Sequence, residues 1–319
     1  MLYLFLILGL ALLLAGANFL VDSSVAIAKK AKISDFIIGL TIVGMGTSAP
    51  ELFVSISSAL KGMGDMAIGN VIGSNICNIM LILGVTALIA PFGVNRANLR
   101  RDIPITALAS IVLALLSFDT LFGGKTNVIS CGEGVAMLVA FIAFMIYSFR
   151  RPQDSADDEE PANPGLMSRL NYPILVVIAV ASLAALIYGG NMFLDSTVQL
   201  ARILGLSDSV ISITIIAVGT SLPELVTCVI AALKGNSQLA LGNALGSNIF
   251  NILLVLGASA AISPLALVGV DIVDYSLMIV SALMLVLFSF TLRHNVIDRW
   301  EGAIFVAGYI GYMAYLLLK

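Results

Sequence analysis

The sequence predicts an all-α integral membrane protein of ten transmembrane helices, arranged as two inverted five-helix repeats. Three observations lead to this prediction: the composition, ten long apolar stretches, and motifs that recur at one constant spacing. Of the 319 residues, 60% are hydrophobic and only 11% are charged, and the mean hydropathy is +1.06. Soluble domains carry about 25% charged residues, so this chain has too little polar surface for water and is suited to lipid.

Ten apolar stretches are long enough to cross a hydrocarbon core of about 30 Å. They are residues 2–20, 36–59, 66–90, 103–122, 129–149, 173–194, 209–232, 239–262, 273–291 and 300–318. The first stretch resembles a secretory signal, because the apolar run Leu4–Leu14 is followed by the small residues Ala15, Gly16 and Ala17, but it lacks the basic start of one. The repeat described below indicates that it is a retained span.

Basic residues are distributed unequally between the two sides of this arrangement. Twelve of the 16 Lys and Arg residues fall in loops on one side and four on the other. Because Lys and Arg accumulate in cytoplasmic loops, we expect a multi-pass protein of the cell membrane with both termini outside. The acidic stretch 150–172 is then a cytoplasmic linker. A calcium-sensing role for it is disfavoured, because it lacks EF-hand spacing.

Two motifs of the first half recur in the second half. Gly46-Thr-Ser-x-Pro-Glu51 returns at 219–224, and Gly69-Asn-x-x-Gly-Ser-Asn-Ile-x-Asn78 returns at 242–251. Every matched pair stands 173 positions apart, and other pairs keep the same spacing. They are Asn18 and Asn191, Asp22 and Asp195, Ser34 and Ser207, Asp35 and Asp208, Lys61 and Lys234, and Pro91 and Pro264.

The repeat fixes the domain organisation. Chance does not keep one spacing over so long a stretch, so the halves are copies of each other. Five spans per half is an odd number, which forces the second copy to enter the membrane inverted, as in many secondary transporters. We therefore divide the chain into a first repeat at 1–149, the linker at 150–172 and a second repeat at 173–319.

Glu51 and Glu224 are acids placed deep inside apolar spans, one in each copy of the first motif. A carboxylate at the bilayer centre costs about 2.5–3.5 kcal/mol, and a bound cation would offset this cost. A protonated, hydrogen-bonded structural group is the alternative for a single buried glutamate. Two glutamates in equivalent positions favour the cation site.

Other oxygens accompany each glutamate in the first motif. Its proline has no amide hydrogen, so the carbonyls of the preceding Gly-Thr pair are predicted to be free to line an ion site. Thr47 and Ser48 lie four and three residues before Glu51, which places their oxygens on the same helical face. Thr220 and Ser221 repeat this arrangement in the second copy.

The second motif adds hydroxyl and amide oxygens. Ser74 and Asn78 are four residues apart and share a helical face, as do Ser247 and Asn251. All the candidate ligands offer oxygen, which Ca²⁺ and Na⁺ prefer, whereas zinc or copper would call for His or Cys. The single histidine, His294, falls in a loop.

Three further pairs are expected to be structural. Asn75 and Asn248 would bond across helices, Asp22 and Asp195 would pair with basic loop residues, and Glu133 and Glu301 would sit at helix N-termini. Four glycines of the second motifs, spaced four apart, would allow close helix packing. They are Gly69, Gly73, Gly242 and Gly246.

The doubled pattern GTSxPE and GNxxGSNIxN resembles the alpha repeats of the cation/calcium antiporter superfamily, in particular prokaryotic sodium/calcium exchangers. The resemblance extends over nearly the whole chain. It implies that the second, third, seventh and eighth helices form the ion-binding core, while the first and sixth form a sliding pair that alternates access. It assigns Ca²⁺ to Glu51 and Glu224 with the carbonyls of Thr47 and Thr220. The implied Na⁺ ligands are Ser48, Ser74, Ser221, Ser247 and the carbonyls near Gly44 and Ala217, with Asn78 and Asn251 nearby.

One departure from the family pattern concerns charge. Asn251 stands where many bacterial, archaeal and potassium-dependent relatives carry Asp. The site then holds two potential negative charges in place of three, which resembles the potassium-independent branch, although the change also bears on proton sensitivity.

The expected function is secondary-active antiport of Na⁺ and Ca²⁺ by alternating access, and not an enzymatic reaction. Ca²⁺ and Na⁺ are the transported substrates, with no organic cofactor and no nucleic-acid partner. The lipid bilayer is the surrounding partner, and a monomer is the expected functional unit. The first alternative is a Ca²⁺/H⁺ exchanger, which usually has an acid near the place of Ser74 or Asn75. The alternative of another class is a passive Ca²⁺ channel or sensor.

Overall fold

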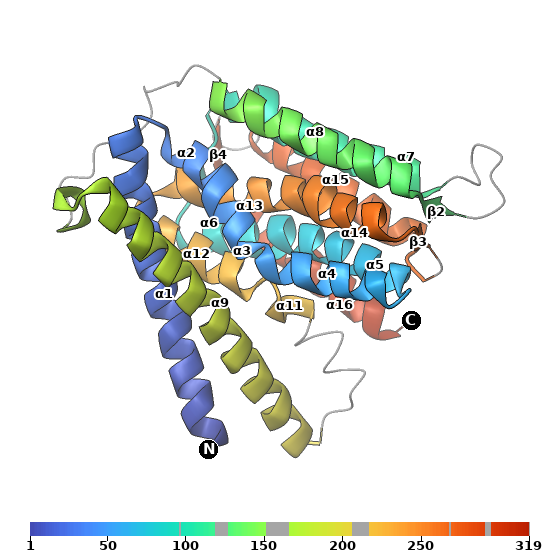
Figure 1. Ribbon diagram of the computed structural model, residues 1–319, viewed down its shortest axis with the longest axis horizontal. Helices are drawn as coiled ribbons and strands as arrows, with labels where there is room; N and C mark the ends of the chain where they lie inside the picture. The colour runs from blue at the N-terminus through green and yellow to red at the C-terminus, as the bar shows by residue number, and fades with distance from the viewer. Residues whose placement is uncertain are drawn as a thin grey trace.

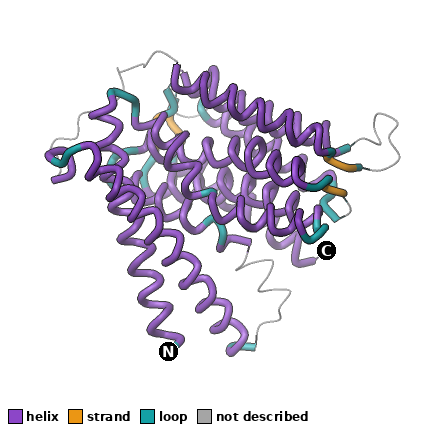
Figure 2. The backbone as a smooth tube through the Cα atoms, viewed as in Figure 1, coloured by secondary structure: helices purple, strands orange, loops and turns teal. Residues whose placement is uncertain are grey.

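The computed structural model describes residues 1–95, 97–118, 127–150, 166–205, 217–267, 269–290 and 295–318, and they form an all-α membrane protein. Helices fill almost the whole molecule in Figure 2. Six helices in the described ranges are long and apolar enough to cross a membrane, and a bent pair at Asp35–Leu60 makes a seventh. The other three predicted spans, 103–122, 209–232 and 273–291, correspond to shorter helices, and the second of these begins outside the described residues.

The elements of the first half and the connection follow the chain in the colours of Figure 1. They are α1 (Leu2–Ala31), α2 (Asp35–Ile38), the π-helix η1 (Gly39–Val43), α3 (Gly44–Thr47), α4 (Ala49–Leu60), α5 (Gly64–Ile76), the π-helix η2 (Cys77–Leu83), α6 (Gly84–Ile89), β1 (Phe92–Gly93), the π-helix η3 (Asn98–Asp102), α7 (Ile103–Ser117), β2 (Val128–Ile129), α8 (Cys131–Arg150) and the 3₁₀-helix η5 (Leu166–Arg169).

The second half repeats much of this order. Its elements are α9 (Tyr172–Ile203), α11 (Ala217–Gly219), α12 (Leu222–Leu233), α13 (Ser237–Phe250), the π-helix η7 (Asn251–Leu256), α14 (Gly257–Ile262), β3 (Leu265–Ala266), α15 (Ile272–Phe288), β4 (Val296–Ile297) and α16 (Arg299–Leu318).

The helices α1 and α9 run antiparallel, side by side, and extend beyond the rest of the bundle (Figure 1). Glycines allow them to touch, because a Cβ atom at Gly9 would lie 2.6 Å from the Phe193 nitrogen and one at Gly189 would lie 2.6 Å from the Leu13 nitrogen. Both helices are longer than the predicted 2–20 and 173–194. The predictions stopped at charged residues, whereas the helices continue through them.

The core of the molecule is built from α5, α13 and the segments that follow them. Residues Leu239–Phe250 of α13 are almost completely buried. A Cβ atom at Gly242 would collide with the Phe36 carbonyl, and one at Gly246 would collide with the Leu40 carbonyl. The predicted close approach is therefore confirmed for these two glycines. The equivalent neighbours of Gly69 and Gly73 fall in 206–216, outside the described residues.

Short strands link the two halves. β1 pairs antiparallel with β4, and β2 pairs antiparallel with β3. Each pair therefore joins a loop of the first half to a loop of the second, and the pairs lie at opposite ends of the bundle (Figures 1 and 2). These strands have only two residues each, and the apolar pattern of the sequence did not predict them.

The helix that carries the first motif is broken at Ser48. The segments Asp35–Thr47 and Ala49–Leu60 meet at an angle of 46°, and Pro50 stands in the first turn of α4. A proline suits a first turn because its missing N–H would have no partner there. The helix is thus interrupted beside the proline, and the first turn of α4 places Glu51 in the buried core.

Candidate functional site

Glu51 and Glu224 occupy the same place in two different helices. Each lies in the first turn of its helix, α4 or α12, directly after a proline. Both are 1% exposed, and they are close enough for their charges to repel each other. The partial positive charge of a helix N-terminus favours a carboxylate at this position, but it does not neutralise two of them.

Serine hydroxyls connect the two glutamates reciprocally. The Ser48 Oγ donates to Glu224 Oε1 at 3.1 Å, and the Ser221 Oγ donates to Glu51 Oε1 at 3.4 Å. The serine in each copy of the first motif thus binds the glutamate in the other copy. Among the described residues, the second oxygen of each carboxylate, Oε2, is buried without a hydrogen-bond partner.

The asparagines of the second motifs form a matching network. The Asn78 Nδ2 donates to Asn248 Oδ1 at 2.9 Å, and the Asn251 Nδ2 donates to Asn75 Oδ1 at 3.1 Å. These bonds fix the amide groups, because only the nitrogen can donate. The oxygens of Asn78 and Asn251 are buried and have no hydrogen-bond partner within the described ranges.

Asn75 and Asn248 also bond across the helices through their backbones, as predicted. The Asn75 Nδ2 donates to the Asn248 carbonyl at 3.3 Å, and the Asn248 Nδ2 donates to the Asn75 carbonyl at 3.4 Å. Sequence reasoning missed their second role, which is to hold the amides of Asn78 and Asn251. The signal was present in the motif, since all four asparagines belong to its two copies.

In the described part of this site, four buried acceptor oxygens are therefore left without donors: those of Glu51, Glu224, Asn78 and Asn251. A buried polar group without a partner costs about 1–3 kcal/mol, and a charged one costs more. A hard cation satisfies such oxygens. Within the described residues no three His, Cys, Asp or Glu side chains are grouped to hold a metal, so a cation at the two carboxylates would need neutral oxygens as further ligands.

Neutral oxygens of both motifs and of the segment before the first one lie next to these groups. The Ser247 Oγ donates to the Gly44 carbonyl at 3.4 Å, which brings together two of the predicted ligands. The hydroxyls of Thr47 and Ser247 also lie against Glu224. The Thr47 hydroxyl is 3.2 Å from Asn243 Oδ1, so Asn243 is a further neighbour.

The backbone turns tightly at the end of α3. Ser48 has φ −80° and ψ 8°, and its N–H donates to the Gly44 carbonyl at 3.1 Å. That Pro50 leaves the Gly46 and Thr47 carbonyls free to line an ion site stays a prediction.

The second copy of the first motif, residues 219–224, is described, but the segment just before it is not. Thr220 falls between α11 and α12, and its hydroxyl lies against Glu51. Ala217 begins α11 directly after residues 206–216, which lie outside the described ranges, as does the Ala217 side chain. Ser74 is 3% exposed, so it is buried like its equivalent Ser247.

Asn70 and Asn243 are site neighbours that the sequence-based selection omitted. The Asn70 Nδ2 donates to the Glu51 carbonyl at 3.3 Å and to the Ser55 Oγ at 3.0 Å. In the other half, the Asn243 Nδ2 donates to the Cys228 Sγ at 3.2 Å. Both asparagines follow the first glycine of the second motif, and Asn70 ties α5 to α4 beside the glutamate.

Comparison with known proteins identifies the family. The family model described as sodium/calcium exchanger protein matches residues 1–150 and 174–318. The chain belongs to the sodium/calcium exchanger family. This match leaves out the connection between the two halves of the molecule.

Relatives of this family member are similar over nearly their whole length. CaxA of Alkalimonas amylolytica is 38% identical, with 99% of this chain and 98% of the relative covered. The sodium/calcium exchanger MaX1 of Methanosarcina acetivorans is 33% identical, with 98% of each chain covered. A solved structure of the sodium-calcium exchanger NCX_Mj, soaked with Na⁺ and Sr²⁺, has a TM-score of 0.82 at 33% identity, and 98% of this chain and 99% of that chain are covered. The family member is therefore related to transporters and is not an enzyme.

Other predicted residues of this family member lie outside the site. The Glu133 carboxylate accepts hydrogen bonds from the Ser130 N–H and hydroxyl, at 2.7 and 2.8 Å, in front of α8. The Glu301 carboxylate accepts the Asp298 N–H at 3.1 Å. Both glutamates thus have the predicted role at a helix N-terminus. His294 lies outside the described residues, as do residues 151–165 of the predicted linker.

Proposed function

We propose that this chain exchanges Na⁺ for Ca²⁺ across the cell membrane by alternating access, at a site between Glu51 and Glu224. The observation that carries this proposal is that each glutamate accepts a hydrogen bond from the serine in the other copy of the first motif. One oxygen of each carboxylate is left without a donor among the described residues. Membership of the sodium/calcium exchanger family supports the choice of ions.

The architecture in this proposal is ten membrane spans in two inverted repeats, residues 1–149 and 173–319, joined by a cytoplasmic linker at 150–172. Reciprocal contacts support it, since hydrogen bonds of the core occur in pairs related by the same 173-residue spacing. The pairing of β1 with β4 and β2 with β3 supports it as well. Both termini are outside the cell, and the monomer is the functional unit.

The ligands divide between two kinds of ion. Ca²⁺ binds Glu51 and Glu224 with the carbonyls of Thr47 and Thr220. The Na⁺ ions use the remaining oxygens of the motifs. These are the hydroxyls of Ser48, Ser74, Ser221 and Ser247 and the carbonyls near Gly44 and Ala217, with Asn78 and Asn251 nearby.

Exchange follows from competition for the two carboxylates. One Ca²⁺ or several Na⁺ ions neutralise the site, and both loads cannot be held at once. A neutralised site can move through a closed state in lipid, whereas two unpaired buried charges oppose closure. With Asn251 in place of an acid, the site has two negative charges, so no K⁺ ion is needed to balance a third.

The test is uptake of ⁴⁵Ca²⁺ into vesicles that contain the purified protein and are loaded with Na⁺. We expect uptake that requires the outward Na⁺ gradient. Uptake that continues unchanged after the gradient has been collapsed would contradict antiport and favour a channel. Uptake driven equally by a proton gradient in the absence of Na⁺ would favour Ca²⁺/H⁺ exchange.

The site assignment is tested by removing one charge at a time. We expect Glu51→Gln and Glu224→Gln each to reduce Na⁺-dependent uptake at least about tenfold. Loss of a partner that only orients a metal ligand costs about 10–100-fold, and loss of a charged ligand itself should cost no less. The matched control is Glu133→Gln, which changes a glutamate at a helix N-terminus away from the motifs. Near-normal uptake in either site variant would exclude this assignment.

A further inference from the structure

An ion pair ties the end of α12 to α1. The Lys234 Nζ lies 2.6 Å from Asp22 Oδ1 and donates to the Asn18 carbonyl at 3.0 Å. Lys234 directly follows the last residue of α12, whose first turn carries Glu224. The pair therefore connects a core helix of the site to one member of the long α1–α9 pair.

The same residues exist in the other half. Lys61, Asp195 and Asn191 stand 173 positions from Lys234, Asp22 and Asn18. The backbone holds the two lysines alike, with φ −88° and ψ 3° at Lys61 and φ −85° and ψ 3° at Lys234. A glycine with positive φ follows each lysine, at 72° and 78°. The two turns thus offer their lysines in the same way.

The second pair is nevertheless open. Among the described residues, neither the Lys61 nor the Asp195 side chain has an ion-pair or hydrogen-bond partner, and both residues are exposed. Because the lysine turns are alike, the difference must come from the position of the long helices. α1 packs along α12, whereas α9 makes no comparable contact with α4.

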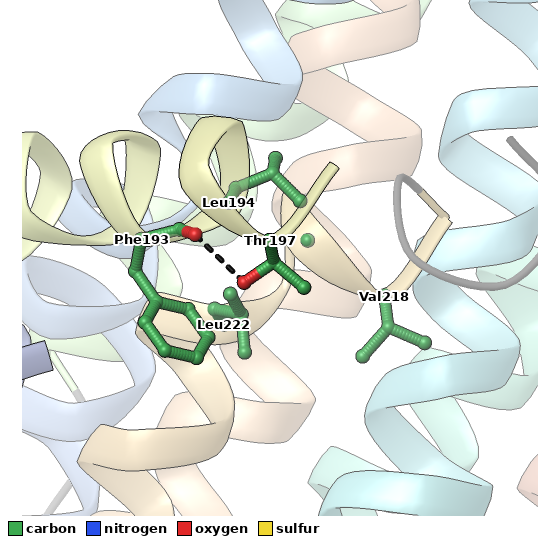
Figure 3. A pocket seen from close by; sticks show the side chains of 6 residues that line it. Phe193, Leu194, Thr197, Val218 and Leu222 are labelled. Carbon is green, nitrogen blue, oxygen red and sulfur yellow. Dashed lines mark hydrogen bonds between the residues drawn. The ribbon is translucent and has the colours of Figure 1, made fainter. Parts of the chain in front are cut away.

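Burial along the two long helices shows the same asymmetry. Leu20 and Val21 of α1 are 2% and 0% exposed, whereas their equivalents in α9, Phe193 and Leu194, are only partly buried. Beside Leu194, the residue before Asp195, a cavity of about 160 Å³ lies between α9 and the α11–α12 segment, which carries Glu224 (Figure 3). Its lining is Phe193, Leu194, Thr197, Val218, Gly219 and Leu222.

We propose that Lys234–Asp22 and Lys61–Asp195 are alternating latches, one of which is closed in each access state of the protein. This inference rests on the proposed alternating access by inverted repeats. The present structure has the Lys234 latch closed and the Lys61 latch open. In the opposite state α9 packs along α4, Lys61 binds Asp195 and the Asn191 carbonyl, and Lys234 releases Asp22.

The latches would set the balance between the two states. One ion pair is lost and an equivalent one is gained in each conversion, so neither state is strongly favoured by them. A partly exposed ion pair changes an equilibrium by a factor of about two to five. Removal of one latch should therefore shift the population toward the state that the other latch holds.

Disulfide cross-linking in the full-length protein in vesicles tests this inference. The background has Cys77→Ala, Cys131→Ser and Cys228→Ala, which remove the three native cysteines. One variant adds Asp22→Cys with Lys234→Cys, and the other adds Asp195→Cys with Lys61→Cys. We expect both pairs to cross-link. The Asp195–Lys61 pair is open in the present structure, so it can cross-link only when the protein visits the opposite state. Absence of the Asp195–Lys61 cross-link would overturn the inference.

The coupling between the latches is tested in the Asp195→Cys, Lys61→Cys protein. We expect Lys234→Met to raise the rate of the Asp195–Lys61 cross-link about two- to fivefold, because it removes the closed latch. Asp22→Lys combined with Lys234→Asp restores an ion pair with its charges exchanged, so the rate should return to its starting value. The matched control is Lys30→Met, which removes an exposed charge near the end of α1. An unchanged rate in Lys234→Met, or a rate that stays raised in the charge-swapped protein, would overturn the coupling.

The failure of this inference differs from failure of the proposed function. ⁴⁵Ca²⁺ uptake is measured on vesicles of the native chain in parallel. Na⁺-driven uptake together with a missing Asp195–Lys61 cross-link would reject the latches and leave exchange standing. Absence of Na⁺-driven uptake would reject exchange, while the cross-links would still report whether two arrangements of α9 and α4 exist.

Discussion

Asn75 and Asn248 determine which atoms two other asparagines present to the site. Each uses its side-chain oxygen to accept the amide N–H of Asn251 or Asn78, and its own amide to bond the facing backbone. An amide with its nitrogen held in this way must direct its oxygen elsewhere. These two residues are therefore positioning residues for the oxygens that we propose as ion neighbours.

At this scale we expect Asn248→Ala to lower the apparent affinity for Ca²⁺ by about 10–100-fold, the usual cost of losing a partner that orients a ligand. The variant leaves the Asn78 amide without its acceptor, so the amide can rotate away from the site. The measurement is the Ca²⁺ dependence of Na⁺-driven uptake. Asn75→Ala should give a similar loss through Asn251, because the two networks are reciprocal.

The control for this prediction is Asn171→Ala, which removes an asparagine in front of α9 that makes no side-chain capping bond. A shift in affinity of less than twofold in both site variants would mean that the amides do not need these partners. Size-exclusion profiles of the purified variants distinguish a lost orientation from a lost fold, because an unfolded protein elutes as aggregate.

The candidate residues of the site could be predicted from the sequence to the extent that a repeated motif identifies them. Glu51 and Glu224 stood out because an acid inside an apolar span requires compensation. The hydrogen-bond partners did not stand out, because a pairing such as Asn78 with Asn248 depends on how two distant helices face each other. The tight turn at Ser48, whose N–H donates to the Gly44 carbonyl at 3.1 Å, did not stand out either.

At the scale of elements, the apolar pattern located the helices but not their shapes. Hydropathy placed spans near Gly64–Ile89 and Ser237–Ile262, and the structure adds a π-helix at Cys77–Leu83 and another at Asn251–Leu256. A π-turn is unfavourable in an isolated helix and persists where surrounding packing holds it, frequently beside functional residues. No local sequence signal predicted these turns.

The packing of α13 against the first half provides a prediction at this scale. A Cβ atom at Gly246 would collide with the Leu40 carbonyl of η1, so Gly246→Ala forces the two helices apart. Overpacking costs about 1–3 kcal/mol, which lowers the thermal midpoint of the detergent-solubilised protein by roughly 2–10 °C. Thermal unfolding followed by tryptophan or thiol fluorescence measures the shift.

Gly311→Ala is the matched control for this change, since a Cβ atom there would meet no described heavy atom within 4 Å. Alanine also favours a helix over glycine, so this variant should keep or slightly raise the thermal midpoint. Equal midpoints for Gly246→Ala and Gly311→Ala would contradict the close approach of α13 and η1.

At the scale of the whole molecule, the connections between the halves are as important as the halves themselves. The strand pairs β1–β4 and β2–β3 each join a loop of one half to a loop of the other. The two glutamates are also bound by serines from opposite halves. A site built this way is incomplete in either half alone, which explains why the motif occurs twice in one chain.

The proposed inverted arrangement makes a prediction about equivalent positions. Met63 precedes α5 and Asn236 precedes α13, at matching places 173 positions apart. An odd number of spans per repeat places them on opposite sides of the membrane. The background for this test is Cys131→Ser, because the other two cysteines are buried. In this background we expect Met63→Cys to react with a membrane-impermeant maleimide in intact cells. Asn236→Cys should react only after permeabilisation, as the excess of basic residues on its side requires.

Labelling of both cysteines in intact cells would place the two loops on one side and rule out an inversion between the halves. The two halves would then be parallel copies, and the helices that carry Glu51 and Glu224 would enter the membrane from the same side. The reciprocal bonds from Ser48 to Glu224 and from Ser221 to Glu51 fit a two-fold relation between the halves. A two-fold axis in the membrane plane exchanges the inside with the outside, and this is the symmetry that alternating access needs.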